Sequence, residues 1–372
     1  MPKYIGAIRK PVKRANAERY LLIMLLSFAA SVILTRIYLQ LTGFPQIGTG
    51  ELHIAHMLWG GLLLFVSAVL MLTLANSWAL NLSAILSGAG VGLFIDEVGK
   101  FITKTNDYFY PVAAPIIYAF FLLTVMFYLH VRGRASSDAR SELYHAFENL
   151  GEAVDDDLDV YETANIQVRL QRVVAAKDDY PDQARLAQAL LDLLHSNQIT
   201  LVEHQPTRWE KIAKSIKAFE DKYFIRRAHK TLLMIGLGAF GIGSLIALAP
   251  VILALTAPIY LEQISQQIIA AGLVSNPSGL IWFTTRLTLQ GMVGALLLGS
   301  AVFLLFGRDQ RGIALGYFGL LLYLLTVNLL VLYFDQFTTI VVTLIQFGLF
   351  IGVIRYRQRF LDPQPAPITA HQ

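Results

Sequence analysis

The stretch LNLSAILSGAGVGLFIDEVGKFI, residues 80–102, decides the fold class. About 20 mainly apolar residues cross the hydrocarbon core of a bilayer as a helix, so this stretch predicts a membrane span. Two adjacent acids, Asp96 and Glu97, follow its apolar part. Small side chains precede Asp96 at intervals of four residues, on one helix face: Ala84, Gly88 and Gly92. A second helix can approach such a face closely, so we expect Asp96 to point into a helix bundle.

The composition of the whole chain also indicates a membrane protein. Of its 372 residues, 55% are hydrophobic and only 15% are charged, and the mean hydropathy is +0.54. About a quarter of the residues of a soluble domain are charged. The chain has no cysteine, which excludes disulfides, thiolate zinc sites, cysteine-ligated iron–sulfur clusters and cysteine nucleophiles.

Seven further stretches are as long and as apolar as residues 80–102. We therefore predict an all-α, polytopic membrane helix bundle of about eight transmembrane helices, with an inserted cytoplasmic helical domain. The predicted spans are 20–41, 53–75, 80–102, 111–131, 231–255, 286–306, 312–334 and 336–356. None of them shows the alternating pattern of a membrane β-strand.

Lysine and arginine near the span ends predict the orientation, because these residues concentrate on the cytoplasmic side. Six basic residues precede the first span, and further ones lie at Arg132, Arg134, Lys230, Arg308, Arg311, Arg355, Arg357 and Arg359. All of these basic residues lie on the cytoplasmic side if there are eight spans and both termini are cytoplasmic. We therefore expect a location in the plasma membrane (bacterial-type inner membrane). The basic N-terminus is then a topology signal, and we expect no nucleic-acid partner.

A highly charged segment between two groups of four spans predicts a separate domain. We expect a basic cytoplasmic N-terminus at 1–19, a first four-span unit at 20–132, a cytoplasmic four-helix insert at 133–228, a second four-span unit at 229–358 and a cytoplasmic tail at 359–372. Apolar residues recur at helical spacing through the insert.

The fourth predicted helix of the insert, residues 207–225, is basic and amphipathic. Its apolar side contains Trp209, Ile212, Ile216, Phe219 and Tyr223, and lysines lie largely on its other sides, at Lys211, Lys214, Lys217 and Lys222. Such a helix suits anionic lipid headgroups at the surface of the bilayer. Alternatively, it packs on the other three helices of the insert. No pattern identifies a protein partner for the segment 133–228.

The two four-span halves show a weak internal similarity. Residues 59–71, WGGLLLFVSAVLM, align with 292–304, MVGALLLGSAVFL, and FID at 94–96 aligns with YFD at 333–335. Apolar sequences also produce such matches by chance, so a parallel duplication is a hypothesis. Inside the last two spans, we expect the amides of Asn328 and Gln346 to hydrogen-bond across the bundle rather than line a pathway.

Ionisable residues gather near the predicted outer ends of the first three spans: Arg36, His53, His56, Asp96 and Glu97. At 1.5 Å per residue, Arg36 and Asp96 each lie about 24 Å from the inner end of their span. The two histidines begin the second span from outside, on a face that also carries Gly60 and Ser67. We expect this face to pack against the small-residue face of residues 80–102. Because charges inside spans are costly, the cluster is a candidate functional site.

Three hypotheses account for this cluster. As a metal site, His53, His56, Asp96 and Glu97 offer two imidazoles and two carboxylates, a ligand set for a divalent transition metal. As a proton or ion relay, Asp96 or Glu97 exchanges protons with His56 while Arg36 sets the local potential. As a structural network, nearby basic side chains neutralise the two acids.

The sequence therefore predicts a multi-pass integral membrane protein but does not identify its activity. The leading hypothesis is proton or cation handling, including transport, by the outer cluster. The alternatives are a membrane-embedded metal-binding enzyme and a non-enzymatic scaffold or sensor whose cytoplasmic helices bind a partner. No residue is identifiable as catalytic, and no pattern indicates a cofactor other than the transition metal.

Overall fold

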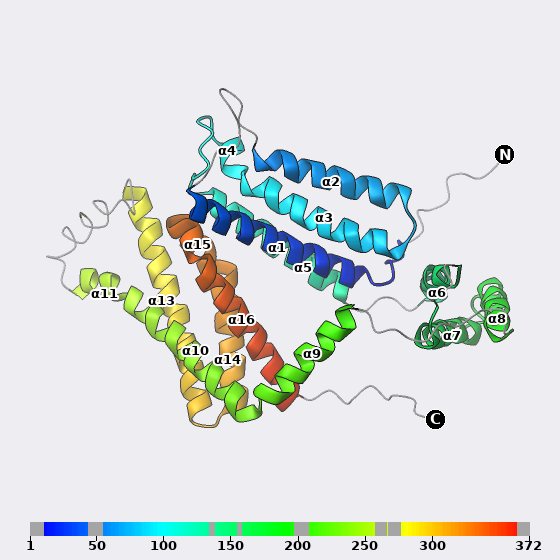
Figure 1. Cartoon of the computed structure of the whole chain (residues 1–372). Helices are drawn as coiled ribbons and strands as arrows, with labels where there is room; N and C mark the ends of the chain where they lie inside the picture. Colours follow the sequence, from blue (N-terminus) through cyan, green and yellow to red (C-terminus); the bar gives the residue numbers. More distant parts are fainter. Residues whose placement is uncertain are drawn as a thin grey trace. The chain divides into compact units, whose positions relative to one another are not determined.

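The computed structural model of the chain is built from helices (Figure 1). It describes residues 11–43, 55–133, 138–154, 158–196, 208–256, 266 and 277–362. The chain forms two compact units. The insert unit comprises Met1–Ile23 and Val125–Lys214, and the membrane unit comprises Met24–Thr124 and Ser215–Gln372.

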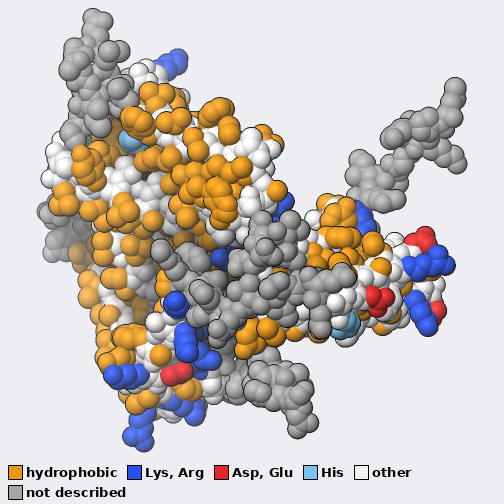
Figure 2. Space-filling model, turned by 45° about the vertical axis from the view of Figure 1, so that its right-hand side comes forward, with side chains coloured by type: hydrophobic (Ala, Val, Ile, Leu, Met, Phe, Trp, Pro, Cys, Tyr) orange, Lys and Arg blue, Asp and Glu red, His pale blue; other side chains and the backbone are white. Residues whose placement is uncertain are grey.

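Seven helical stretches within the described residues are long and apolar enough to cross a membrane. The first four are α1 (Ala17–Thr42), α2 (His56–Thr73), α3 (Ser77–Asp96) and α5 (Ala113–Arg132), with the short α4 (Val98–Ile102) after α3. Many of their large apolar side chains are exposed, and Figure 2 shows a broad hydrophobic surface. A surface of this kind suits contact with lipid. These features are consistent with a multi-pass membrane protein, as predicted.

The second half of the chain continues with α9 (Arg208–Tyr223), α10 (Arg226–Ala247), α11 (Ala249–Thr256), α13 (Pro277–Leu305), α14 (Asp309–Leu322), α15 (Asn328–Asp335) and α16 (Ile340–Tyr356). The π-helical turns Tyr323–Val327 and Arg357–Leu361 follow α14 and α16. Helices α10 and α13 pack closely through glycine, because a Cβ added at Gly241 would lie 2.9 Å from the carbonyl oxygen of Gly294. Their shared core includes Leu237 and Leu297, which are fully buried.

The last candidate stretch, Asp309–Leu361, is a helical hairpin 53 residues long. Its backbone turns at Gln336, whose φ of 48° lies in the left-handed region. Tyr356 near its end donates a hydrogen bond to Asp309 at its start, at 2.8 Å. Asn328 donates to Gln346 at 2.8 Å, so the predicted hydrogen bond between these amides is confirmed. The hairpin therefore has two legs, one through α14 and α15 and one through α16.

The insert unit has a hydrophobic core of its own. Helices α6 (Ala139–Val154), α7 (Val160–Ala175) and α8 (Pro181–His195) pack around buried side chains that include Ala146, Leu158, Ile166, Leu170 and Ala187. A capping box begins α7, because Asp159 accepts a hydrogen bond from the Glu162 backbone at 2.7 Å and Glu162 accepts one from the Asp159 backbone at 3.0 Å. No residue of α9 belongs to the described part of this core.

Candidate functional site

Asp96, the last residue of α3, lies at the centre of the candidate site. Its side chain is fully buried, and that of Arg36 on α1 is 3% exposed. Arg36 donates from Nε to Asp96 Oδ1 at 2.6 Å and from Nη2 to the Asp96 carbonyl oxygen at 3.0 Å. Such charge-assisted hydrogen bonds are the strong ones in proteins, and their loss would leave a buried charge without a partner.

Small residues on two sides of α3 allow this cluster to form. Gly92 faces α1, because an added Cβ would lie 2.7 Å from Ser31 Cβ. Gly90 faces α2 instead, since a Cβ added at Gly60 would lie 2.7 Å from the Gly90 carbonyl oxygen. The expected packing of the two small-residue faces against each other is therefore wrong. Helix α3 lies between α1 and α2 (Figure 1), so both neighbours reach Asp96.

His56, the first residue of α2, bridges the two acids. Its Nε2 lies 3.1 Å from Asp96 Oδ2, and its Nδ1 lies 3.3 Å from Glu97 Oε1. An ionised carboxylate only accepts hydrogen bonds, and a neutral imidazole has one N–H. Only the contact with Asp96 is a hydrogen bond, and one imidazole N–H satisfies it; the contact with Glu97 is a close approach of two polar atoms.

Glu97 has one open oxygen in this arrangement. Its Oε1 contacts His56 and also accepts a hydrogen bond from Lys100 Nζ at 2.9 Å. Its Oε2 is buried and has no hydrogen-bond partner among the described residues. A buried carboxylate oxygen without a donor is unfavourable, and a proton or a cation at this oxygen would relieve the cost.

Two aromatic residues complete the site, and sequence analysis missed both. Tyr108, in the loop before α5, donates to Asp96 Oδ2 at 2.7 Å. The Arg36 guanidinium carbon lies 4.3 Å from the centre of the Tyr108 ring and 3.6 Å from that of Phe337. Burial and the negative charge of Asp96 raise the pKa of the Tyr108 phenol above its usual value. Tyr108 lies between predicted spans, and Phe337 lies at the turn of the last hairpin, so helical periodicity indicated neither contact.

The described residues do not favour the metal hypothesis. His53 lies outside the described residues, and the remainder contain no group of three His, Asp or Glu side chains that could hold a metal ion. The geometry gives the reason. Asp96 and Glu97 contact opposite nitrogens of the His56 ring, so an ion bound to either nitrogen would meet only one of the two acids.

The second half of the membrane unit contains a related pair that sequence analysis did not single out. Arg286 on α13 donates from Nη1 to Asp335 Oδ1, at the end of α15, at 3.0 Å. In the alignment of the two halves, Asp335 corresponds to Asp96 and Arg286 to His53. The two pairs do not correspond position by position, because Asp96 pairs with Arg36 of α1 and His53 lies outside the described residues.

Comparison with known proteins adds no constraint on this site, since the chain matches no known protein family, curated protein or solved structure.

Proposed function

We propose that this chain is an eight-span protein of the plasma membrane (bacterial-type inner membrane) that binds and releases a proton near the outer surface, in the handling or transport of protons or cations. One observation carries the proposal: His56 lies between two buried acids, and Oε2 of one of them, Glu97, is buried with no hydrogen-bond partner among the described residues. Ionisable groups at this depth are costly and persist mainly where they pair or function.

The contacts within the membrane unit support eight spans. Gln336, at the turn of the last hairpin, donates to the Phe109 carbonyl oxygen at 2.9 Å, so this turn lies at the same end as the His56 cluster. The other end of the hairpin, at Asp309 and Tyr356, lies beside Arg226 and Lys230. Each leg therefore runs from one end of the bundle to the other. The basic end is the cytoplasmic end by the positive-inside rule.

The site can exchange a proton between Glu97 and His56. In one state Glu97 is protonated and donates to a neutral His56, which donates to Asp96. In the other, His56 is an imidazolium that donates to both carboxylates. The nitrogen–oxygen distances of 3.1 and 3.3 Å allow this change with only small movements of heavy atoms. Arg36 and Lys100 balance the two negative charges on either side of the ring.

The test is proton movement in proteoliposomes that contain a trapped pH dye and carry an imposed ion or pH gradient. We expect Glu97→Gln and His56→Gln to reduce the flux by an order of magnitude, because each removes a proton-binding position. Glu148→Gln makes the same chemical change in the insert unit and should leave the flux unchanged. Wild-type flux in both site variants, with normal folding and orientation, would refute the proposal.

The insert unit supports a second candidate function, a cytoplasmic domain that binds a protein partner. Besides its own core, it exposes large apolar side chains on α6 and α7: Tyr144, Phe147, Val160 and Tyr161. Exposed apolar groups of this kind mark interaction surfaces. A photo-crosslinking amino acid at Tyr161 of the full chain should capture one defined partner in cells, whereas the same group at exposed Gln188 should not. Equal labelling at both positions would argue against a partner.

A further inference from the structure

We propose that α9 lies on the cytoplasmic membrane surface, and that its apolar stripe and an arginine-lined pocket at the start of α14 bind anionic phospholipid headgroups. This inference is independent of the proton site, since it concerns the opposite end of the membrane unit.

The apolar stripe of α9 has no partner in the described structure. Ile212, Ile216, Phe219 and Tyr223 recur at intervals of four, three and four residues, which places them on one helix face. They are 48%, 58%, 57% and 53% exposed. The rings of Phe219 and Tyr223 contact each other, with centroids 4.8 Å apart, and form a continuous apolar surface. An amphipathic helix of this kind buries its apolar face in the region between headgroups and acyl chains.

The charges around the stripe are complementary to an anionic surface. Lys211, Lys214 and Lys217 make no ion pair with any described residue. Two acids near the end of the helix are neutralised from the turn after α16: Arg359 lies 3.2 Å from Glu220 Oε1 and 2.8 Å from Asp221 Oδ1. These ion pairs hold α9 to the end of the bundle and do not involve its lysines. Basic side chains beside an apolar face favour anionic over neutral lipid.

The position of α9 along the chain fixes its level in the membrane. It ends at Tyr223, and α10, which is part of a candidate span, begins at Arg226. The stripe therefore lies within a few residues of the point where the chain enters the bilayer. Figure 2 shows Lys and Arg side chains gathered at the lower end of the membrane unit, beneath its hydrophobic surface. This is the end predicted to be cytoplasmic, where anionic lipid is found.

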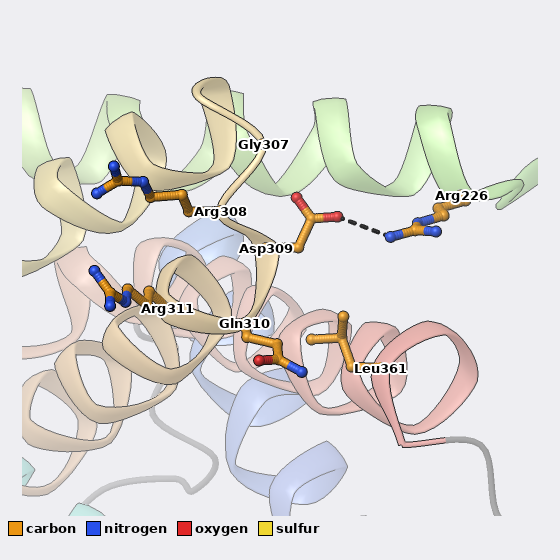
Figure 3. Close-up of a pocket in the computed structure, with 7 residues that line it drawn as sticks. All are labelled: Arg226, Gly307, Arg308, Asp309, Gln310, Arg311 and Leu361. Atoms are coloured by element: carbon orange, nitrogen blue, oxygen red, sulfur yellow. Dashed lines mark hydrogen bonds and ion pairs between the residues drawn. The ribbon is translucent and has the colours of Figure 1, made fainter.

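A pocket of about 570 Å³ lies at the same end, where α13 turns into α14. Figure 3 shows its lining: Arg226, Gly307, Arg308, Asp309, Gln310, Arg311 and Leu361. Asp309 is already neutralised, because Arg226 lies 3.2 Å and Lys230 2.6 Å from its carboxylate oxygens. Arg308 and Arg311 have no acidic partner among the described residues, and in Figure 3 they extend to the same side of the turn. Two adjacent guanidinium groups suit a lipid phosphate.

The absence of cysteine allows a direct test with the full chain. Ile216→Cys on the stripe and Ala218→Cys on the opposite side of α9 each accept one environment-sensitive fluorophore. In vesicles of phosphatidylcholine with phosphatidylglycerol, we expect the label at 216 to be protected from iodide and the label at 218 to be quenched. Replacing Lys211 and Lys222 by Gln should release the stripe, since each basic side chain near the surface contributes about a fivefold preference.

Three outcomes would overturn the proposal. Equal quenching at the two labels would show that the stripe is not in the bilayer. Equal protection in pure phosphatidylcholine would remove the preference for anionic headgroups. Protection of the label at 216 that persists after Lys211 and Lys222 are replaced by Gln would indicate a protein contact instead. The pocket is tested by native mass spectrometry. We expect the wild type and the control variant Lys104→Gln to retain phosphatidylglycerol, and the double variant Arg308→Gln, Arg311→Gln to lose it. Equal retention in all three proteins would refute lipid binding at the pocket.

Discussion

Removing the charge of Asp96 is the most direct test of the buried ion pair. Asp96→Asn keeps the shape of the side chain but leaves the Arg36 guanidinium, whose side chain is 3% exposed, without a counter-charge. Breaking one side of a buried pair costs about 3–5 kcal/mol. The ring contacts to Tyr108 and Phe337 persist in the variant and partly stabilise the cation. We therefore expect the free energy of unfolding to fall by about 3 kcal/mol, near the lower end of this range.

The assay is the fraction of detergent-solubilised protein that stays monomeric after heating, measured by size-exclusion chromatography. A loss of about 3 kcal/mol lowers the midpoint by about 4 °C in a chain of this size. Asp362→Asn is the matched control, because its partner Arg357 is 60% exposed and such pairs contribute less than about 1 kcal/mol. Arg36→Met combined with Asp96→Asn should cost less than the sum of the single changes. A shift at Asp96 no larger than at Asp362, or strict additivity, would refute the reasoning.

Three further predictions concern packing and titration. Gly60→Val should separate α2 from α3 and lower the thermal midpoint by several degrees, because an added Cβ would lie 2.7 Å from the backbone of Gly90. Gly61→Val is the control and should be neutral, since an added Cβ there meets nothing within 4 Å. A similar shift of the midpoint in both variants would contradict the close approach of the two helices. Since burial and Asp96 raise the pKa of Tyr108, its phenol should keep its proton above pH 10, so Tyr108→Phe should not change the tyrosinate absorbance gained up to pH 11. Hydrogen bonds from Ser141 lower the pKa of Asp138, so its contribution to stability is present above about pH 4 and lost as pH falls through the lowered value. Asp138→Ala should therefore cost about 1 kcal/mol at pH 7, and this cost should decrease as the pH falls below the lowered pKa.

Much of the candidate site was predictable because depth in a membrane follows from counting residues. Arg36 and Asp96 lie at equal distances from the inner ends of their spans, and the structure brings them to 2.6 Å. Small residues every four positions on α3 correctly indicated a face for close packing. The partner of that face was not predictable, because spacing along one helix does not identify which neighbour it meets.

The sequence by itself determined the class of the protein. Length and hydropathy decide whether a stretch crosses a bilayer, since the hydrocarbon core admits only a backbone that satisfies its own hydrogen bonds. Tertiary structure alone decided that α3 lies between α1 and α2, that His56 contacts a different acid with each nitrogen, and that Tyr108 reaches Asp96 from a loop. These features depend on how each helix is rotated about its axis and on where the loops return, and both are set by packing between segments far apart in the chain.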